Sequence, residues 1–62
     1  MNSVASRLVE ARGNKTRKEV CEAVGISTSA LSMYEIGQRV PRDEIKKKLA
    51  EYYKTTVQAL FF

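Results

Sequence analysis

The residues that could do chemistry in this chain gather in one stretch, V-G-I-S-T-S-A-L-S-M-Y-E-I-G, which covers residues 24–37. Helical spacing places four of its residues on one side, Ala30, Leu31, Tyr34 and Glu35. Short hydroxyls and apolar groups lie on the opposite side, at Thr28, Ser29, Ser32, Met33 and Ile36. Hydroxyls can donate or accept hydrogen bonds at base edges, and an apolar group can contact a thymine methyl. The same face also fits an exposed helix surface of low charge, so the residues alone leave both interpretations open.

Two helices must position this face, and the sequence predicts where each begins and ends. Thr16 and Glu19 form a capping box for a helix that ends at Gly25. Ser27 can cap the next helix, which we expect to run to about Ile36, before Gly37. A turn of only three residues then separates the two, which predicts a helix-turn-helix whose second helix enters the DNA major groove.

Three further helices complete the predicted architecture, an all-α, compact five-helix bundle formed as a single domain over residues 1–62. The first ends near Arg12, and its apolar stripe is Val4, Ala5, Leu8, Val9 and Ala11.

The fourth helix follows Pro41, with Asp43 and Glu44 in its first turn. Its inward-facing residues are Ile45, Leu49 and Tyr52. Lys46, Lys47 and Lys48 are predicted to form a solvated face, and Tyr52 and Tyr53 to lie in the core and at its rim. Thr55 or Thr56 caps a last short helix carrying Val57, Leu60 and Phe61.

Composition limits the function further. The chain has 62 residues, with 11 Lys and Arg against seven Asp and Glu, and this charge of +4 favours a polyanionic partner. It has no His and a single cysteine, so we expect no metal site, no cofactor and no internal disulfide. No pair of acids converges as in a hydrolase, so we expect no enzymatic activity. A small buried Cys21, with no signal peptide or membrane span, predicts a cytoplasmic location.

A longer motif carries a family resemblance. The segment T-R-K-E-V-C-E-A-V-G-I-S-T-S-A-L-S-M-Y-E-I-G resembles the helix-turn-helix of the Cro/phage-repressor class, or Xre family, with a lambda-repressor-like fold. The later segments P-R-D-E-I-K-K-K-L-A-E-Y-Y and V-Q-A-L-F-F resemble its fourth and fifth helices, so the resemblance covers Leu8 to Phe62. The chain departs from the family pattern at Arg17, where glutamine is usual, at Cys21, where alanine is commoner, and at Ile36, where a polar residue is usual.

The resemblance implies roles for individual residues. Base contacts fall to Thr28, Ser29, Ser32 and Met33, and contacts with the DNA backbone or minor groove to Arg17, Lys18, Gln38, Arg39 and Arg42. Arg12 matches the family arginine that pairs with Glu35, which as an inward-facing charge needs a partner. For Arg17, pairing with a nearby acid remains an alternative to gripping a phosphate. For Lys18, Arg39 and Arg42 the alternative is simple solvent exposure.

These observations predict sequence-specific binding of double-stranded DNA by a transcriptional regulator, and more specifically a repressor that occupies an operator. Because one helix-turn-helix reads one half-site, we expect a homodimer on DNA, with Phe62 at its interface. The alternative is an antitoxin-like or other protein-interaction module, with DNA binding secondary. In that case the exposed Ile36 and the terminal Phe61-Phe62 would dock a partner protein.

Overall fold

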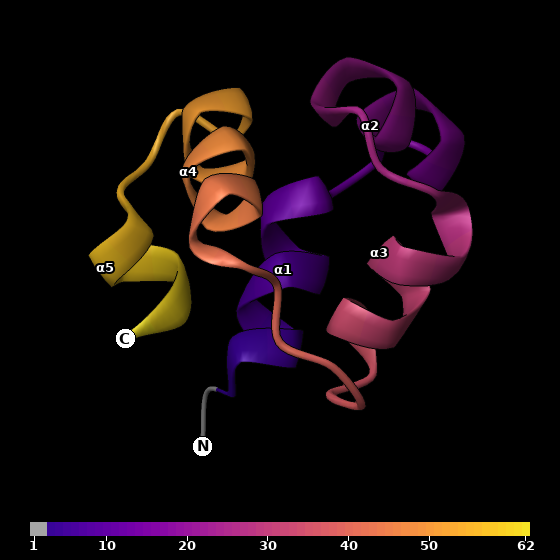
Figure 1. Ribbon diagram of the computed structural model, residues 1–62. Coiled ribbons are helices and arrows are strands. Elements are labelled where there is room, and N and C mark those ends of the chain that lie inside the picture. The colour runs from indigo at the N-terminus through magenta and orange to yellow at the C-terminus, as the bar shows by residue number, and fades with distance from the viewer. Residues whose placement is uncertain (1–2) are drawn as a thin grey trace.

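Five helices make up residues 3–62, the part of the chain that the computed structural model describes (Figure 1). They are α1 (Val4–Arg12), α2 (Arg17–Val24), α3 (Thr28–Glu35), α4 (Asp43–Tyr52) and α5 (Val57–Phe61). No strand occurs in this range. The predicted all-α architecture of five helices is therefore confirmed, while residues 1–2 of the predicted domain lie outside the described residues.

Hydroxyl side chains begin four of the five helices. The oxygens of Ser3, Thr16, Ser27 and Thr56 each accept a hydrogen bond, 3.0–3.1 Å long, from the backbone N–H three residues on. Each satisfies one of the backbone donors that a helix start leaves unpaired. The caps predicted at Thr16 and Ser27 are confirmed, and Thr56 rather than Thr55 caps α5. Helix α4 has no side-chain cap, but Asp43 and Glu44 lie in its first turn, where its dipole favours negative charge.

The helix-turn-helix geometry depends on the backbone of Gly25. Its φ of 85° and ψ of 36° are left-handed, a conformation that glycine adopts without a steric penalty. In this conformation the N–H groups of Gly25 and Ile26 both donate to the carbonyl of Cys21, at 2.8 and 3.1 Å. The turn thus ends α2 and redirects the chain within three residues, as the sequence predicted.

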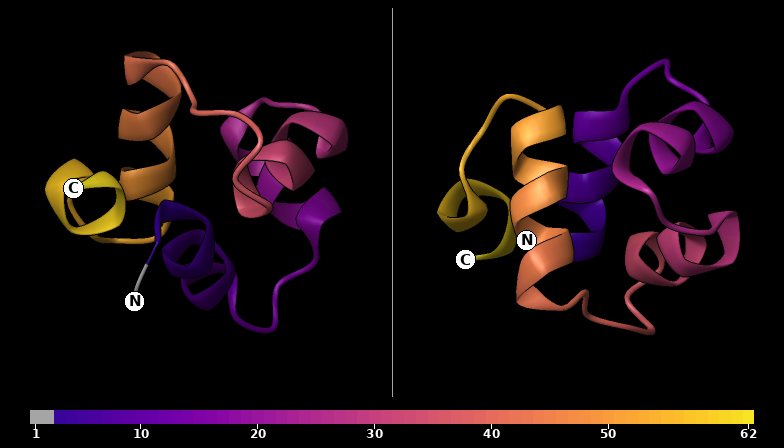
Figure 2. Two further views of the ribbon diagram at one scale, coloured as in Figure 1. Left: turned by 90° about the horizontal axis from the view of Figure 1, so that it is seen from below. Right: turned by 45° about the horizontal axis from the view of Figure 1, so that its top comes forward.

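Side chains from all five helices meet in one hydrophobic core. Leu8, Val20, Leu31 and Leu49 have no exposed surface, and burying each such side chain contributes about 1.5–3 kcal/mol. Helix α1 packs against α3 and α5, α2 packs against α3 and α4, and α4 packs against α5. Figure 2 shows the consequence: α2 and α3 lie together on one side of α1, and α4 and α5 lie together on another. The outer face of α3 therefore remains uncovered by the other four helices.

Two sequence predictions about burial were wrong. Val9, assigned to the inner stripe of α1, is 43% exposed, because Leu8 faces the core and the next residue lies about 100° further round the helix. Lys46, assigned to a solvated face, has a side chain only 15% exposed. Its Nζ lies 5.6 Å from the ring centre of Phe61 and 5.3 Å from that of Phe62. Its aliphatic stem packs while its ammonium group faces the two rings, whereas Lys47 and Lys48 are exposed.

Candidate nucleic-acid interface

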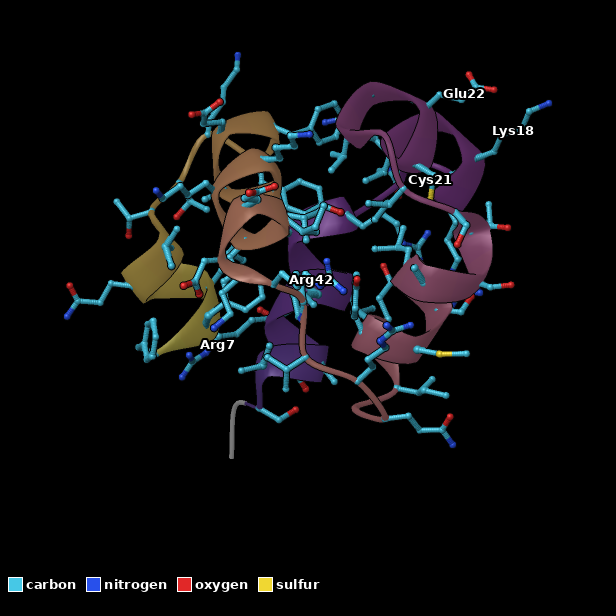
Figure 3. All side chains as sticks on the ribbon, viewed as in Figure 1. Arg7, Lys18, Cys21, Glu22 and Arg42 are labelled. Atoms are coloured by element: carbon cyan, nitrogen blue, oxygen red, sulfur yellow. The ribbon has the colours of Figure 1, made fainter. Side chains whose placement is uncertain are left out.

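Close contact between α2 and α3 sets the direction of the candidate recognition helix. The Sγ of Cys21 donates a hydrogen bond of 3.3 Å to the carbonyl of Ser27, the N-cap of α3. Figure 3 places the Cys21 sulfur where the two helices approach each other. Burial raises the pKa of the Cys21 thiol, with the Glu35 carboxylate adding to the rise, so the thiol stays protonated and able to donate. The cysteine is thus a small packing residue with one polar contact.

The outer face of α3 is open to solvent along its length. Thr28 and Ser29 are exposed, Met33 is 38% exposed, and Ser32 is partly buried. Ile36, directly after the helix, is 60% exposed. The opposite side, with Leu31, Tyr34 and Glu35, is buried. All four residues predicted to contact bases therefore share one accessible face, which holds hydroxyls and apolar groups but no Lys, Arg, Asn or Gln.

Positive side chains flank this face at two places. At the start of α2, Lys18 is exposed and points away from the body of the molecule (Figure 3). In the segment between α3 and α4, Arg39 and Arg42 are exposed together with the neutral Gln38, whereas Pro41 is buried. A hollow of about 440 Å³ separates the first turn of α3 from that of α4, and Arg39 and Arg42 both line it. The two arginines thus lie near the helix N-termini, which themselves favour anions.

A buried ionic centre lies on the inner side of α3, opposite its exposed face. The side chain of Glu35, the last residue of α3, is fully buried. Its Oε2 accepts a hydrogen bond of 2.8 Å from Nε of Arg12, at the end of α1. The Arg12 Nη1 also donates to the carbonyl of Lys15 at 2.9 Å, and its side chain is only 19% exposed. The structure therefore brings the two predicted partners together and joins α1, the following loop and α3.

Arg17 belongs to the same ionic centre. Its Nε donates a hydrogen bond of 2.9 Å to Oε1 of Glu35, so each carboxylate oxygen accepts from a different arginine. Pairing with a nearby acid, which the sequence left open as an alternative, is thus what the structure shows. Yet the Arg17 side chain remains 44% exposed at the first residue of α2. Sequence reasoning did not identify Glu35 as this acid, because it paired the carboxylate with Arg12 only.

A comparison against protein-family models agrees with this arrangement of five helices and a three-residue turn. A family described as helix-turn-helix matches residues 7–60, most of the chain. The chain belongs to this helix-turn-helix family. It is the Cro/repressor-type, Xre-like family that the sequence motif resembles, and its domain is a DNA-binding domain of the kind found in transcription regulators. No curated protein and no solved structure matched the chain significantly.

Two absences hold within residues 3–62 of this helix-turn-helix domain. No helix is long and apolar enough to cross a membrane. No group of three or more His, Cys, Asp or Glu residues lies close enough together to hold a metal ion.

Tyr53, directly after α4, is influenced electrostatically by the ionic centre of the helix-turn-helix domain. Its hydroxyl is buried and has no hydrogen-bond partner among the described residues. Burial first, and then the Glu35 carboxylate, raise the pKa of Tyr53 from 10.0 to about 12. The sequence predicted only that Tyr53 lies in the core or at its rim. No sequence motif indicates that the Glu35 carboxylate, 18 positions earlier, influences its hydroxyl.

Replacing Tyr53 with phenylalanine should change the alkaline stability of the domain. The folded state holds the phenol proton more tightly than the unfolded state, so the contribution of Tyr53 is complete below pH 10.0 and is lost as the pH rises through about 12. After allowance for partial exposure, we expect a loss of about 1–2 kcal/mol. Urea unfolding at about pH 9 and about pH 11.5 should show a smaller loss in Tyr53→Phe than in the parent.

Equal losses of stability between the two pH values in Tyr53→Phe and in the parent would show that the Tyr53 hydroxyl is not shielded from water.

Proposed function

We propose that this chain binds double-stranded DNA in a sequence-specific manner as a transcriptional repressor, with α3 in the major groove. The observation that carries the proposal is the accessible face of α3, which bears hydroxyls and apolar groups between two sets of exposed cations. A helix that carries mainly short side chains on this face can approach the bases closely. Repression by occupying an operator requires no chemistry beyond binding.

Affinity in this proposal comes mainly from phosphates. Arg17 and Lys18 at the start of α2, and Gln38, Arg39 and Arg42 before α4, are exposed and flank α3. Cations that neutralise phosphates release condensed counterions from the DNA, which makes binding favourable and dependent on salt. We infer that these residues set the register of the domain on the duplex and leave sequence readout to α3.

Base readout in this proposal falls to Thr28, Ser29, Ser32 and Met33. The three hydroxyls suit hydrogen bonds to base edges, and the Met33 side chain, 38% exposed, suits contact with a thymine methyl. Arginine pairs bidentately with guanine and Asn or Gln with adenine, and α3 has none of these side chains. Part of the specificity therefore comes from DNA shape, which Arg39 and Arg42 read in the minor groove beside α3.

We further propose a weak homodimer on the operator, with Phe62 at its interface. Phe62 is 76% exposed, whereas Leu60 and Phe61 are buried in the core. One phenylalanine contributes about 1.5–3 kcal/mol when buried, which alone cannot sustain a tight dimer. Binding to two half-sites about one DNA turn apart would hold the subunits together by raising their effective concentration.

A second candidate function is a protein-interaction module of the antitoxin type. The exposed apolar residues Ile36 and Phe62, which are 60% and 76% exposed, favour it, as does Val40 at 71%, whereas Phe61, also expected to dock a partner, is buried in the core. In that case DNA binding would be secondary, and alanine at Ile36 and Phe62 would weaken partner binding far more than affinity for a DNA half-site.

Salt titration tests the leading proposal. If the domain makes about three to five phosphate contacts, log affinity should fall with log salt at a slope of roughly −3 to −5 per monomer. Fluorescence anisotropy with a labelled random duplex measures this slope. A slope near zero, or no binding at low salt, would contradict a DNA-binding function.

Substitutions on α3 should change operator preference. Replacing Ser29 or Met33 with alanine removes a base contact, and each good contact is worth about 1–3 kcal/mol against the wrong base. Selection from a random DNA pool identifies the operator, and competition against random DNA then gives the specificity ratio. The ratio should fall while non-specific affinity is kept. Equal losses on both DNAs would restrict these residues to positioning.

Replacing Phe62 with serine tests the dimer. Sedimentation should show less dimer, and a palindromic operator should lose cooperativity while a half-site keeps its affinity. Val9→Ser is a matched control, since Val9 is an exposed apolar residue on α1. Full cooperativity in Phe62→Ser would place the interface elsewhere.

A further inference from the structure

We propose that the buried Glu35 carboxylate positions the Arg17 guanidinium for a two-pronged grip on a DNA phosphate, an inference that rests on the proposed DNA binding. Glu35 is then more than a structural link between helices. It is a positioning residue that acts on DNA through Arg17, although its own side chain is fully buried.

The two arginines of the ionic centre differ in what they have left to donate. Arg12 uses Nε on Glu35 and Nη1 on the Lys15 carbonyl, and its side chain is 19% exposed. Arg17 uses Nε on Glu35, forms no other hydrogen bond among the described residues, and is 44% exposed. Only Arg17 therefore combines a fixed attachment to the protein with free terminal amino groups.

The planarity of the guanidinium fixes where those amino groups face. Nε and the edge formed by Nη1 and Nη2 lie on different sides of the central carbon, so anchoring Nε to Glu35 turns this edge away from the carboxylate. The edge presents parallel N–H donors, which match two oxygens of one phosphate. Lysine cannot replace this arrangement, because its single ammonium has no separate anchoring nitrogen.

Charge and location favour an anion at this edge. Two guanidinium groups face one carboxylate, so the centre keeps a net positive charge even when both contacts are formed. Arg17 is also the first residue of α2, whose N-terminal dipole favours anions. A guanidinium that is already held loses less conformational freedom when it binds a phosphate, which strengthens binding.

The contrary possibility gives an effect of opposite sign. If Glu35 competed with phosphate for Arg17, removing the carboxylate charge would release the arginine and tighten DNA binding. The sign of the Glu35 effect therefore separates positioning from competition.

A double-mutant cycle with Arg17→Gln, Glu35→Gln and the double variant tests the inference, with affinity for one random duplex measured over a range of salt concentrations. Arg17→Gln should weaken binding about tenfold and reduce the magnitude of the salt slope by about one. Glu35→Gln should weaken binding severalfold although Arg17 is present. In the Glu35→Gln background, the loss caused by Arg17→Gln should shrink to less than about threefold.

Two control variants separate this effect from folding and from total charge. Arg12→Lys changes the other partner of the Glu35 carboxylate, an arginine whose Nε and Nη1 are already used within the protein. It should lower the midpoint temperature of unfolding and leave the salt slope of DNA binding unchanged. Lys54→Asn removes one positive charge after α4, at a φ of 57° that asparagine tolerates, and should leave both the affinity and the cycle unchanged. All affinities are compared at a temperature where circular dichroism shows each variant folded.

If Glu35→Gln unfolds, NMR on the unsubstituted protein tests the inference instead. In ¹⁵N NMR spectra, the Arg17 Nε–H signal should stay protected from exchange when duplex DNA is added, while its Nη signals shift. Loss of Nε–H protection on DNA, an additive cycle, or tighter binding by Glu35→Gln would each overturn the positioning role. If the parent chain bound no DNA at all, the proposed function itself would fail, a result distinct from these three.

Discussion

The buried carboxylate of Glu35 is the constraint on which the arrangement of the other elements depends. A charge without exposed surface is tolerated only when its oxygens are paired, and here each oxygen accepts from a different arginine. Those arginines come from the end of α1 and the start of α2, while the carboxylate ends α3. Three helices are therefore fixed to one point, and the outer face of α3 is oriented relative to the start of α2.

The hydrophobic core and this ionic centre have separate roles. The core side chains, such as Leu8, Leu31 and Leu49, supply stability. Because apolar contact is not directional, they tolerate small changes in the orientation of the helices. The charged hydrogen bonds are directional and short, so they determine how the helices are oriented. An interface that must match a regular duplex needs both, since a misplaced helix would lose contacts even in a stable domain.

Sequence reasoning predicted local features of the fold better than contacts between side chains. The caps at Thr16 and Ser27 and the turn at Gly25 depend on a few neighbouring residues, and all three are present. The exposure of Val9, the burial of Lys46 and the position of the Tyr53 hydroxyl depend on how helices distant in sequence pack. For the candidate site, the accessible face of α3 followed from helical periodicity, whereas the contact between Arg17 and Glu35 required the three-dimensional arrangement.

The composition of the α3 face has a consequence for how much information one domain can extract from DNA. If α3 reads bases as proposed, Thr28, Ser29 and Ser32 would each accept several bases, because a hydroxyl serves as donor or acceptor, whereas an amide or guanidinium would demand one. A half-site read in this way would tolerate many sequences. Distinguishing a few operators within a genome would then require the proposed homodimer to combine the information of two half-sites and their spacing. Such a reader could regulate a group of related sites with graded occupancy, rather than a single site in an all-or-none manner.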